Sequence, residues 1–294
     1  MVAHKFPVRN ADGEFIGIGT IQSDITERRK AEQEIADAMA QINASIEYAS
    51  RIQRSILPPV EALSSAVSEH FVLWEPRDTV GGDMYWCRKW GSGVLILLGD
   101  CTGHGVPGAF MTLIANGALD LAYMEVPPGD AAALLQRMHQ LIQLALGQDR
   151  GEGDSDDGLE AGACFLQRGR PTLTFAGARF SLFVSEVGEV REVKGDKSGL
   201  GYRGIARNVS FTNQTVDFVP DALYYMTSDG LIDQIGGEKS RSFGKRRFKE
   251  LLTSIRDIPM DQQRDQVQQA LSDWQGDQRR RDDVSILGFK GGST

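Results

Sequence analysis

The sequence predicts an α+β fold in which two β-sheets pack face to face and helices cover the outside. From Phe71 onward, short apolar runs punctuated by glycine alternate with helical patterns, and strand patterns stand at both ends of this stretch. The predicted strands are 94–99, 161–166, 172–177, 182–187, 222–228 and 284–289. The predicted helices are 108–123, 131–146, 245–255 and 260–274.

A β-hairpin is expected at the N-terminal end. Residues 5–9 and 15–21 flank the polar turn Asn10-Ala11-Asp12-Gly13, which ends in the glycine that hairpins favour. Two strands alone are marginally stable, so residues 1–25 are expected to be part of something larger. Together with the segment 23–32, Ser-Asp-Ile-Thr-Glu-Arg-Arg-Lys-Ala-Glu, this hairpin resembles the closing strands and exit motif of a PAS sensor domain. An ordinary hairpin leading into a helix is the alternative interpretation.

Residues 26–57 are predicted to form a helical stalk. Thr26 is the expected N-cap, and Pro58-Pro59 ends the helix. Apolar side chains follow alternating steps of four and three, with Gln53 at the one skipped position: Ile35, Met39, Ile42, Ile46, Ala49 and Ile56. This heptad seam predicts a coiled coil and a homodimer formed through the stalk. The alternative is an amphipathic helix packed on its own domain.

Composition restricts the class of protein. The 294 residues are 41% hydrophobic, enough for a substantial core, and the net charge of −8 argues against a nucleic-acid-binding surface. Cys87, Cys101 and Cys164 lack the spacing of zinc sites or of a disulfide framework, which favours a reducing cytoplasm. No run approaches the ~20 apolar residues of a membrane span, so this chain is predicted to be cytoplasmic, although a longer parent protein could be membrane-tethered.

The segment 147–158 is polar, acidic and rich in glycine. It is predicted to be a mobile surface loop. Its acidic spacing does not match the ligand pattern of an EF-hand, so a calcium loop is not expected.

Four acidic segments place an aspartate at the edge of an apolar strand pattern. They are Gly81-Gly82-Asp83, Gly99-Asp100-Cys101-Thr102-Gly103-His104-Gly105, Ser228-Asp229-Gly230 and Arg281-Asp282-Asp283-Val284-Ser285. Each alone is also ordinary turn chemistry. Carboxylates that leave strand ends beside glycine can converge on Mg²⁺ or Mn²⁺, because these hard cations favour oxygen ligands. Together the four segments indicate metal-assisted phosphate chemistry.

In this order, the four segments resemble the metal-binding motifs of protein phosphatase 2C-type (PPM) serine/threonine phosphatases. The resemblance is strongest to the bacterial branch of the stage II sporulation protein E and RsbU families, and it covers roughly residues 49–290. Further matching segments are 49–58, 103–111, 176–179 and 243–244. The resemblance implies a PPM-type domain over residues 58–294. The segment 194–204 is similar to the SiaA-like subfamily.

The resemblance also implies a site that holds two ions, Mn²⁺ or Mg²⁺. Asp100 would bridge both ions, and the carbonyl of Cys101 would assist one of them. Asp83 would hold the first ion, and Asp229 and Asp282 the second. By this analogy Asp100 and Asp83 act in catalysis through a metal-activated water.

Asp283 and His104 each have two candidate roles. Asp283 is interpreted as a supporting neighbour of Asp282, although either could be the main ligand. His104 could protonate the leaving oxygen of serine or threonine, or it could shape the glycine loop through hydrogen bonds, and the second role is favoured.

The resemblance implies direct hydrolysis of phosphoserine or phosphothreonine without a covalent phosphoenzyme. The expected substrate is a small phosphorylated regulatory protein of bacteria, of the partner-switching or SiaC-like kind. Two alternatives remain open, namely a catalytically silent signalling scaffold and a small-molecule phosphoesterase.

Basic residues outside the acidic segments have open roles. Arg179 could bind phosphate through its planar fork or form an ion pair. The clusters Lys245-Arg246-Arg247 and Arg279-Arg280-Arg281 could recognise an acidic phosphoprotein, but solvated charged faces are the default interpretation.

Overall fold

The computed structural model describes residues 1–150, 156–167 and 169–292. The chain divides into two units, Met1–Ala49 and Ser50–Thr294. Helix α1 (Thr26–Ile56) begins in the first unit, and its last two turns belong to the second. Each unit is described by itself.

The first unit contains the predicted hairpin. Strands β1 (Val2–Arg9) and β2 (Phe15–Ser23) pair antiparallel, and Asn10 Oδ1 accepts hydrogen bonds from the backbone of Asp12 and Glu14 in the turn. Helix α1 begins at Thr26 itself. The Asp24 carboxylate accepts from the Thr26 N–H at 2.9 Å and from its hydroxyl at 2.6 Å, so the side chain that caps this end is Asp24 rather than the predicted Thr26.

The apolar seam of α1 is open to solvent in the single chain. Ile35, Met39 and Ile42 are 61%, 59% and 58% exposed. A coiled-coil partner would cover such a stripe. The coiled coil and the dimer stay predictions.

The second unit is a sandwich of two five-stranded sheets, as the sequence predicted. The first sheet has the order β10-β7-β6-β5-β4 and the second β3-β14-β11-β8-β9. Their strands are β3 (His70–Glu75), β4 (Asp83–Trp90), β5 (Gly93–Cys101), β6 (Leu159–Gln167), β7 (Thr172–Ala178), β8 (Ser181–Glu186), β9 (Glu189–Lys194), β10 (Gln214–Asp217), β11 (Leu223–Thr227) and β14 (Val284–Lys290). All the paired strands within these sheets run antiparallel.

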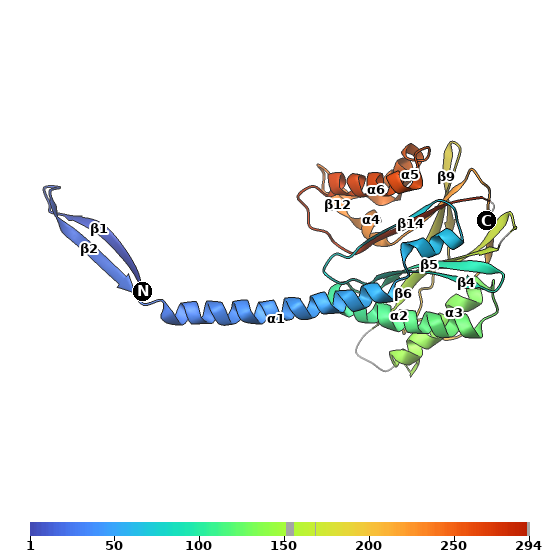
Figure 1. Ribbon diagram of the computed structural model, residues 1–294, viewed down its shortest axis with the longest axis horizontal. Helices are drawn as coiled ribbons and strands as arrows, with labels where there is room; N and C mark the ends of the chain where they lie inside the picture. Colours follow the sequence, from blue (N-terminus) through green and yellow to red (C-terminus); the bar gives the residue numbers. More distant parts are fainter. Residues whose placement is uncertain (151–155, 168, 293–294) are drawn as a thin grey trace. The chain divides into compact units, whose positions relative to one another are not determined.

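Helices cover both outer faces of the sandwich (Figure 1). Helices α2 (Gly105–Glu125) and α3 (Ala131–Ala145) pack on the first sheet, and α5 (Gly244–Ser254) and α6 (Met260–Gln275) on the second. The short elements are α4 (Asp229–Asp233), β12 (Ile235–Gly236), β13 (Arg241–Ser242) and the 3-10 turns η1 (Val60–Ser65) and η2 (Gln148–Arg150).

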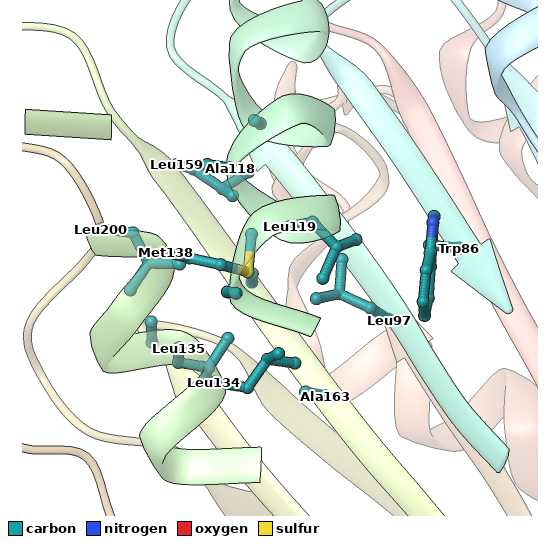
Figure 2. Packing of buried hydrophobic residues seen from close by; sticks show 14 of the residues in the cluster. Trp86, Leu97, Ala118, Leu119, Leu134, Leu135, Met138, Leu159, Ala163 and Leu200 are labelled. Atoms are coloured by element: carbon teal, nitrogen blue, oxygen red, sulfur yellow. The ribbon is translucent and has the colours of Figure 1, made fainter. Parts of the chain in front are cut away.

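The alternation of side chains along each strand divides the interior into three apolar layers. On β5, Ile96 and Leu98 point between the sheets, whereas Leu95 and Leu97 point to α2 and α3. Figure 2 shows Leu97 and Ala163 of the sheet near Leu119 of α2 and Leu134 of α3. Because both faces of β5 are buried, its end is a rigid place from which to project Asp100.

All predicted strands and helices are present, with ends shifted by a few residues. Strands β3, β4, β9 and β10 were not predicted. In β4, Met84, Tyr85 and Trp86 are buried on both faces and give no alternating pattern. The predicted acidic loop lies partly outside the described residues, at 151–155, and Gln148 before this gap is 2% exposed. In the described parts of the chain, no helix is long and apolar enough to cross a membrane.

Candidate metal centre

Asp83 and Asp100 face each other at one end of the first sheet. Asp83 opens β4, Asp100 is the last residue but one of β5, and the two are direct partners in the antiparallel register. Asp83 is 1% exposed, and its Oδ2 accepts a hydrogen bond of 2.8 Å from the hydroxyl of Ser228. Within the described residues, its buried Oδ1 has no hydrogen-bond partner.

Asp229, which follows a strand of the second sheet, lies beside Asp100. It follows β11, and its backbone N–H donates to Asp100 Oδ2 at 3.4 Å. Ser228, one residue earlier, is bonded to Asp83 and also accepts from the N–H of Ser285 at 2.9 Å. The carboxylates therefore gather where the edges of the two sheets meet.

The neighbouring pair Asp282 and Asp283 has two different environments. Asp283 is buried and accepts backbone hydrogen bonds from Arg77 (2.6 Å) and Gly82 (2.5 Å), one at each carboxylate oxygen. Asp282 accepts only from the Asp283 N–H, at 2.9 Å, among the described residues. The close approach explains Gly82: a Cβ there would lie 2.4 Å from the Gly103 carbonyl and 2.9 Å from that of Cys101.

Burial and mutual repulsion disfavour the charged forms of these carboxylates. Burial, together with the charges of Asp283 and Asp282, raises the pKa of Asp83 to about 8 despite hydrogen bonds to its charged form. The pKa of Asp100 is raised by burial and by Asp83, and that of Asp229 is raised to about 6 by burial and by Asp282. A bound cation would offset this repulsion.

A divalent cation fits the cluster. The orphaned Asp83 Oδ1 is an available hard ligand, and positive charge would relieve the repulsion between the carboxylates. Within residues 1–150, 156–167 and 169–292, no three histidine, cysteine, aspartate or glutamate side chains are arranged to hold an ion unaided. An ion bound here would complete its coordination with water and substrate oxygens, as Mg²⁺ does at one or two carboxylates.

His104 is engaged at both ring nitrogens. Arg77 Nη1 donates to Nε2 at 2.6 Å, because a guanidinium can only donate, and Nδ1 lies 3.1 Å from Asp78 Oδ2. The imidazole thereby links the glycine loop after Asp100 to the loop that carries Asp78. This geometry supports the loop-shaping role over acid catalysis.

Comparison with known proteins identifies the family. The family model described as stage II sporulation protein E (SpoIIE) matches residues 91–290. The chain belongs to this family. The solved SiaA-PP2C domain of Pseudomonas aeruginosa is 38% identical, with a TM-score of 0.79, and the match covers 88% of this chain and 100% of that one. The predicted assignment to the PPM-type serine/threonine phosphatases is thus confirmed, and the metal dependence of this class agrees with the acidic cluster.

Two more distant structures share the fold. The SpoIIE phosphatase domain with a regulatory fragment from Bacillus subtilis is 14% identical, with a TM-score of 0.60, covering 76% of this chain and 62% of that one. The RsbU and RsbW domains of a Mycobacterium tuberculosis protein are 17% identical, with a TM-score of 0.61, covering 78% and 61%.

A cavity of about 210 Å³ opens beside the acidic cluster of this SpoIIE-family domain. Its lining includes the acidic residues Asp100, Asp229 and Glu160 and the basic residues Arg179 and Lys245. Glu160 is the register partner of Asp100 on β6, and burial raises its pKa despite the nearby Arg179. The cavity therefore combines the carboxylates with two cations.

Sequence reasoning missed several contacts of this site. The sequence motif around Ser228 predicts no role for this residue, and no pattern predicts Glu160 as part of the site. Gln53 was interpreted as a gap in the heptad seam, yet it is 4% exposed and bonds to the backbone of Gly81. The skipped seam position was the available signal for Gln53, whereas Glu160 depends on strand register that a single sequence does not reveal.

Proposed function

We propose that this domain hydrolyses phosphoserine or phosphothreonine on a small phosphorylated regulatory protein, with two Mn²⁺ or Mg²⁺ ions. The observation that carries the proposal is the pairing of buried Asp83 with Asp100 at the sheet edge, with one Asp83 oxygen free of hydrogen bonds among the described residues. Buried acids in this arrangement are stabilised in their charged form by a bound cation.

The chain offers a ligand for each expected role. Asp83 and the Cys101 carbonyl would hold one ion, Asp229 and Asp282 the other, and Asp100 both. When bound, two such ions lower the pKa of a water and offset negative charge on the phosphoryl oxygens. Asp282 is the better ligand of the adjacent pair, because both oxygens of Asp283 already accept backbone hydrogen bonds.

The surrounding residues fix the ligands in place. The Ser228 hydroxyl holds Asp83 Oδ2, the Asp229 N–H holds Asp100 Oδ2, and Asp283 braces the loop before Asp83 through Gly82. The Cys101 thiol is buried, and burial together with the adjacent carboxylates raises its pKa, so a thiolate nucleophile is disfavoured. Direct attack by water is the chemistry that these residues support.

The finer aspects of function follow from the similarity to SiaA and from the stalk. A SiaC-like or partner-switching regulator is the proposed substrate class, and the exposed seam of α1 is proposed to form a homodimer. Three buried free thiols agree with a cytoplasmic location. The hairpin β1–β2 is proposed to be the end of a PAS-like domain.

Manganese-dependent release of phosphate from a phosphoserine peptide tests the main proposal, with Asp100→Ala as the comparison. Wild-type turnover that depends on Mn²⁺ and disappears in Asp100→Ala is expected. Binding of the phosphopeptide without turnover would instead indicate a scaffold. Hydrolysis of small phosphate esters combined with inactivity on every phosphopeptide would indicate a metabolite phosphoesterase.

A further inference from the structure

The short connection between β7 and β8 crosses from the first sheet to the second beside the acidic cluster, and Arg179 is its first residue. Its φ of 53° lies in the left-handed region, which residues with a side chain adopt at a free-energy cost. The backbone is held there by a hydrogen bond of 2.8 Å from the Arg179 N–H to the Asp196 carbonyl. This backbone conformation determines the direction in which the Arg179 side chain leaves the connection.

The guanidinium of Arg179 is placed by three neighbours. Nε donates to the Lys197 carbonyl at 3.0 Å, and the group lies 5.5 Å from the centre of the Tyr202 ring. Nη1 lies 3.4 Å from Glu160 Oε1, which is a long and therefore weak contact. Nη2 has no hydrogen-bond partner in the described parts of the chain. Hydrogen-bond donors of Arg179 are thus available in the cavity that Asp100 and Asp229 also line.

Tyr202 joins this arginine to the loop that carries the acidic cluster. Its hydroxyl is 3.2 Å from Thr102 Oγ1, two residues after Asp100. Its ring lies against the backbones of Gly158 and Gly199, where a Cβ would come within 2.5 Å and 2.6 Å of it. The ring is therefore fixed, and it offers Arg179 a rigid face.

Lys245, the other cation of the cavity, is already committed. Its Nζ lies 2.6 Å from Glu192, whose side chain is only 9% exposed. Arg179, with its side chain 48% exposed, has only the long contact to Glu160 as an ion pair among the described residues. Of the two cations, Arg179 is the one free to meet an incoming anion.

We propose that Arg179 binds the phosphoryl group of the substrate in the cavity that Asp100 and Asp229 also line, and that Tyr202 positions its guanidinium. This assignment rests on the proposed phosphatase chemistry. A planar guanidinium matches two phosphoryl oxygens at once, which a lysine does not. Glu160 keeps the arginine oriented before the substrate enters, and the phosphoryl dianion displaces this weak contact.

The test compares Arg179→Asn with wild type, because asparagine tolerates the left-handed backbone and should preserve the turn. Calorimetry with inorganic phosphate in the presence of Mn²⁺ gives phosphate affinity, and titration with Mn²⁺ alone gives metal affinity. We expect phosphate binding to weaken about 10- to 100-fold, with a matching rise in KM for a phosphoserine peptide. Mn²⁺ affinity should stay unchanged, and Arg179→Lys should fall between the two.

Two positioning variants and a matched control complete the test. Tyr202→Leu, which removes the ring, should weaken phosphate binding more than Tyr202→Phe. Arg246→Ala, which removes a 78%-exposed arginine paired with Glu250, should change nothing. Glu160→Gln should tighten phosphate binding, because the competing carboxylate is gone.

Three results would overturn the proposal: unchanged phosphate affinity in Arg179→Asn, an equal loss of Mn²⁺ affinity, or no loss of phosphate affinity when Arg179→Asn is added to Glu160→Gln. The last would mean that Arg179 only neutralises Glu160. Wild-type turnover together with normal phosphate binding by Arg179→Asn refutes this inference and leaves the phosphatase proposal standing. Phosphate binding that depends on Arg179, without turnover of any peptide, supports this inference and refutes the phosphatase proposal.

Discussion

The side-chain amide of Gln53 bonds to both backbone groups of Gly81. Its Nε2 donates to the Gly81 carbonyl at 2.5 Å, and its Oε1 accepts from the Gly81 N–H at 3.2 Å. Nε2 also lies 3.1 Å from Thr112 Oγ1 on α2. The last turns of α1 are thereby connected to the loop that ends in Asp83.

Replacing Gln53 should disturb the acidic cluster from a distance. Gln53→Ala leaves the Gly81 carbonyl and N–H buried without their partner, so we expect Mn²⁺ affinity and phosphopeptide turnover to fall by about tenfold. Ser55→Ala, an exposed position on the same helix, is the control. Full metal affinity in Gln53→Ala would mean that α1 does not support the site.

Asp282 and Asp283 should respond differently to the same change. Asp283→Asn loses an acceptor for a buried backbone N–H, so its free energy of unfolding should drop by about 1–3 kcal/mol. Asp282→Asn should keep its stability and lose Mn²⁺ affinity. Chemical denaturation and calorimetry measure the two effects, and the opposite pattern would exchange the assigned roles.

The metal-free domain should lose stability as the pH rises. Asp83 has a pKa of about 8 when folded and about 3.9 when unfolded, so between these values the folded state holds the extra proton. Stability is therefore highest below pH ~4 as far as this group is concerned, and it falls toward pH ~8. Melting temperatures with a chelator present check the slope, which Asp83→Asn should flatten.

Added Mn²⁺ should stabilise the domain more at pH ~8 than at pH ~5. At the lower pH, protons on Asp83 and Asp229 compete with the ion, because the pKa values of both groups are raised. The shift in melting temperature on adding Mn²⁺ measures this difference. A shift that is equal at both values, or larger in acid, would contradict ligation by these carboxylates.

Charged substitutions in the apolar seam of α1 test whether this helix forms a dimer. Replacing Ile35, Met39 and Ile42 with aspartate should convert a dimer into a monomer in multi-angle light scattering, because these side chains form the exposed seam. The matched control replaces Gln33, whose side chain is bonded to Asp37 on the exposed surface, with aspartate. A wild-type monomer would refute the dimer. Full activity of the monomeric variant would show that pairing does not control catalysis.

Patterns among residues close together in the sequence predicted most of the strands and helices and the main carboxylates of the site. Asp100 and Asp229 each follow a short apolar run and precede glycine or helix signals, so their placement at strand ends was readable from neighbours in the chain. The partners of these residues were not. The bond from Ser228 to Asp83 and the register of Glu160 with Asp100 join segments 145 and 60 residues apart, and no single-sequence signal encodes such pairings.

The roles of Gln53 and Arg179 could not be predicted from the sequence for two other reasons. The seam pattern of α1 marked Gln53 as an interruption, but its buried bonds to Gly81 arise only when the helix packs on the domain. Arg179 carried two open roles because its surroundings, Tyr202 and the Lys197 carbonyl, come from a loop about 20 residues further along. Both residues needed tertiary contacts before chemistry could be assigned.

The hydrogen bond between Ser228 and Asp83 joins the two sheets inside the site itself. A shift of one sheet relative to the other would break this bond while the hydrogen bonds within each sheet remain. Phosphate release therefore depends on how firmly the two sheets pack against each other. Mild urea should silence the enzyme at concentrations where its circular dichroism is still that of the folded chain.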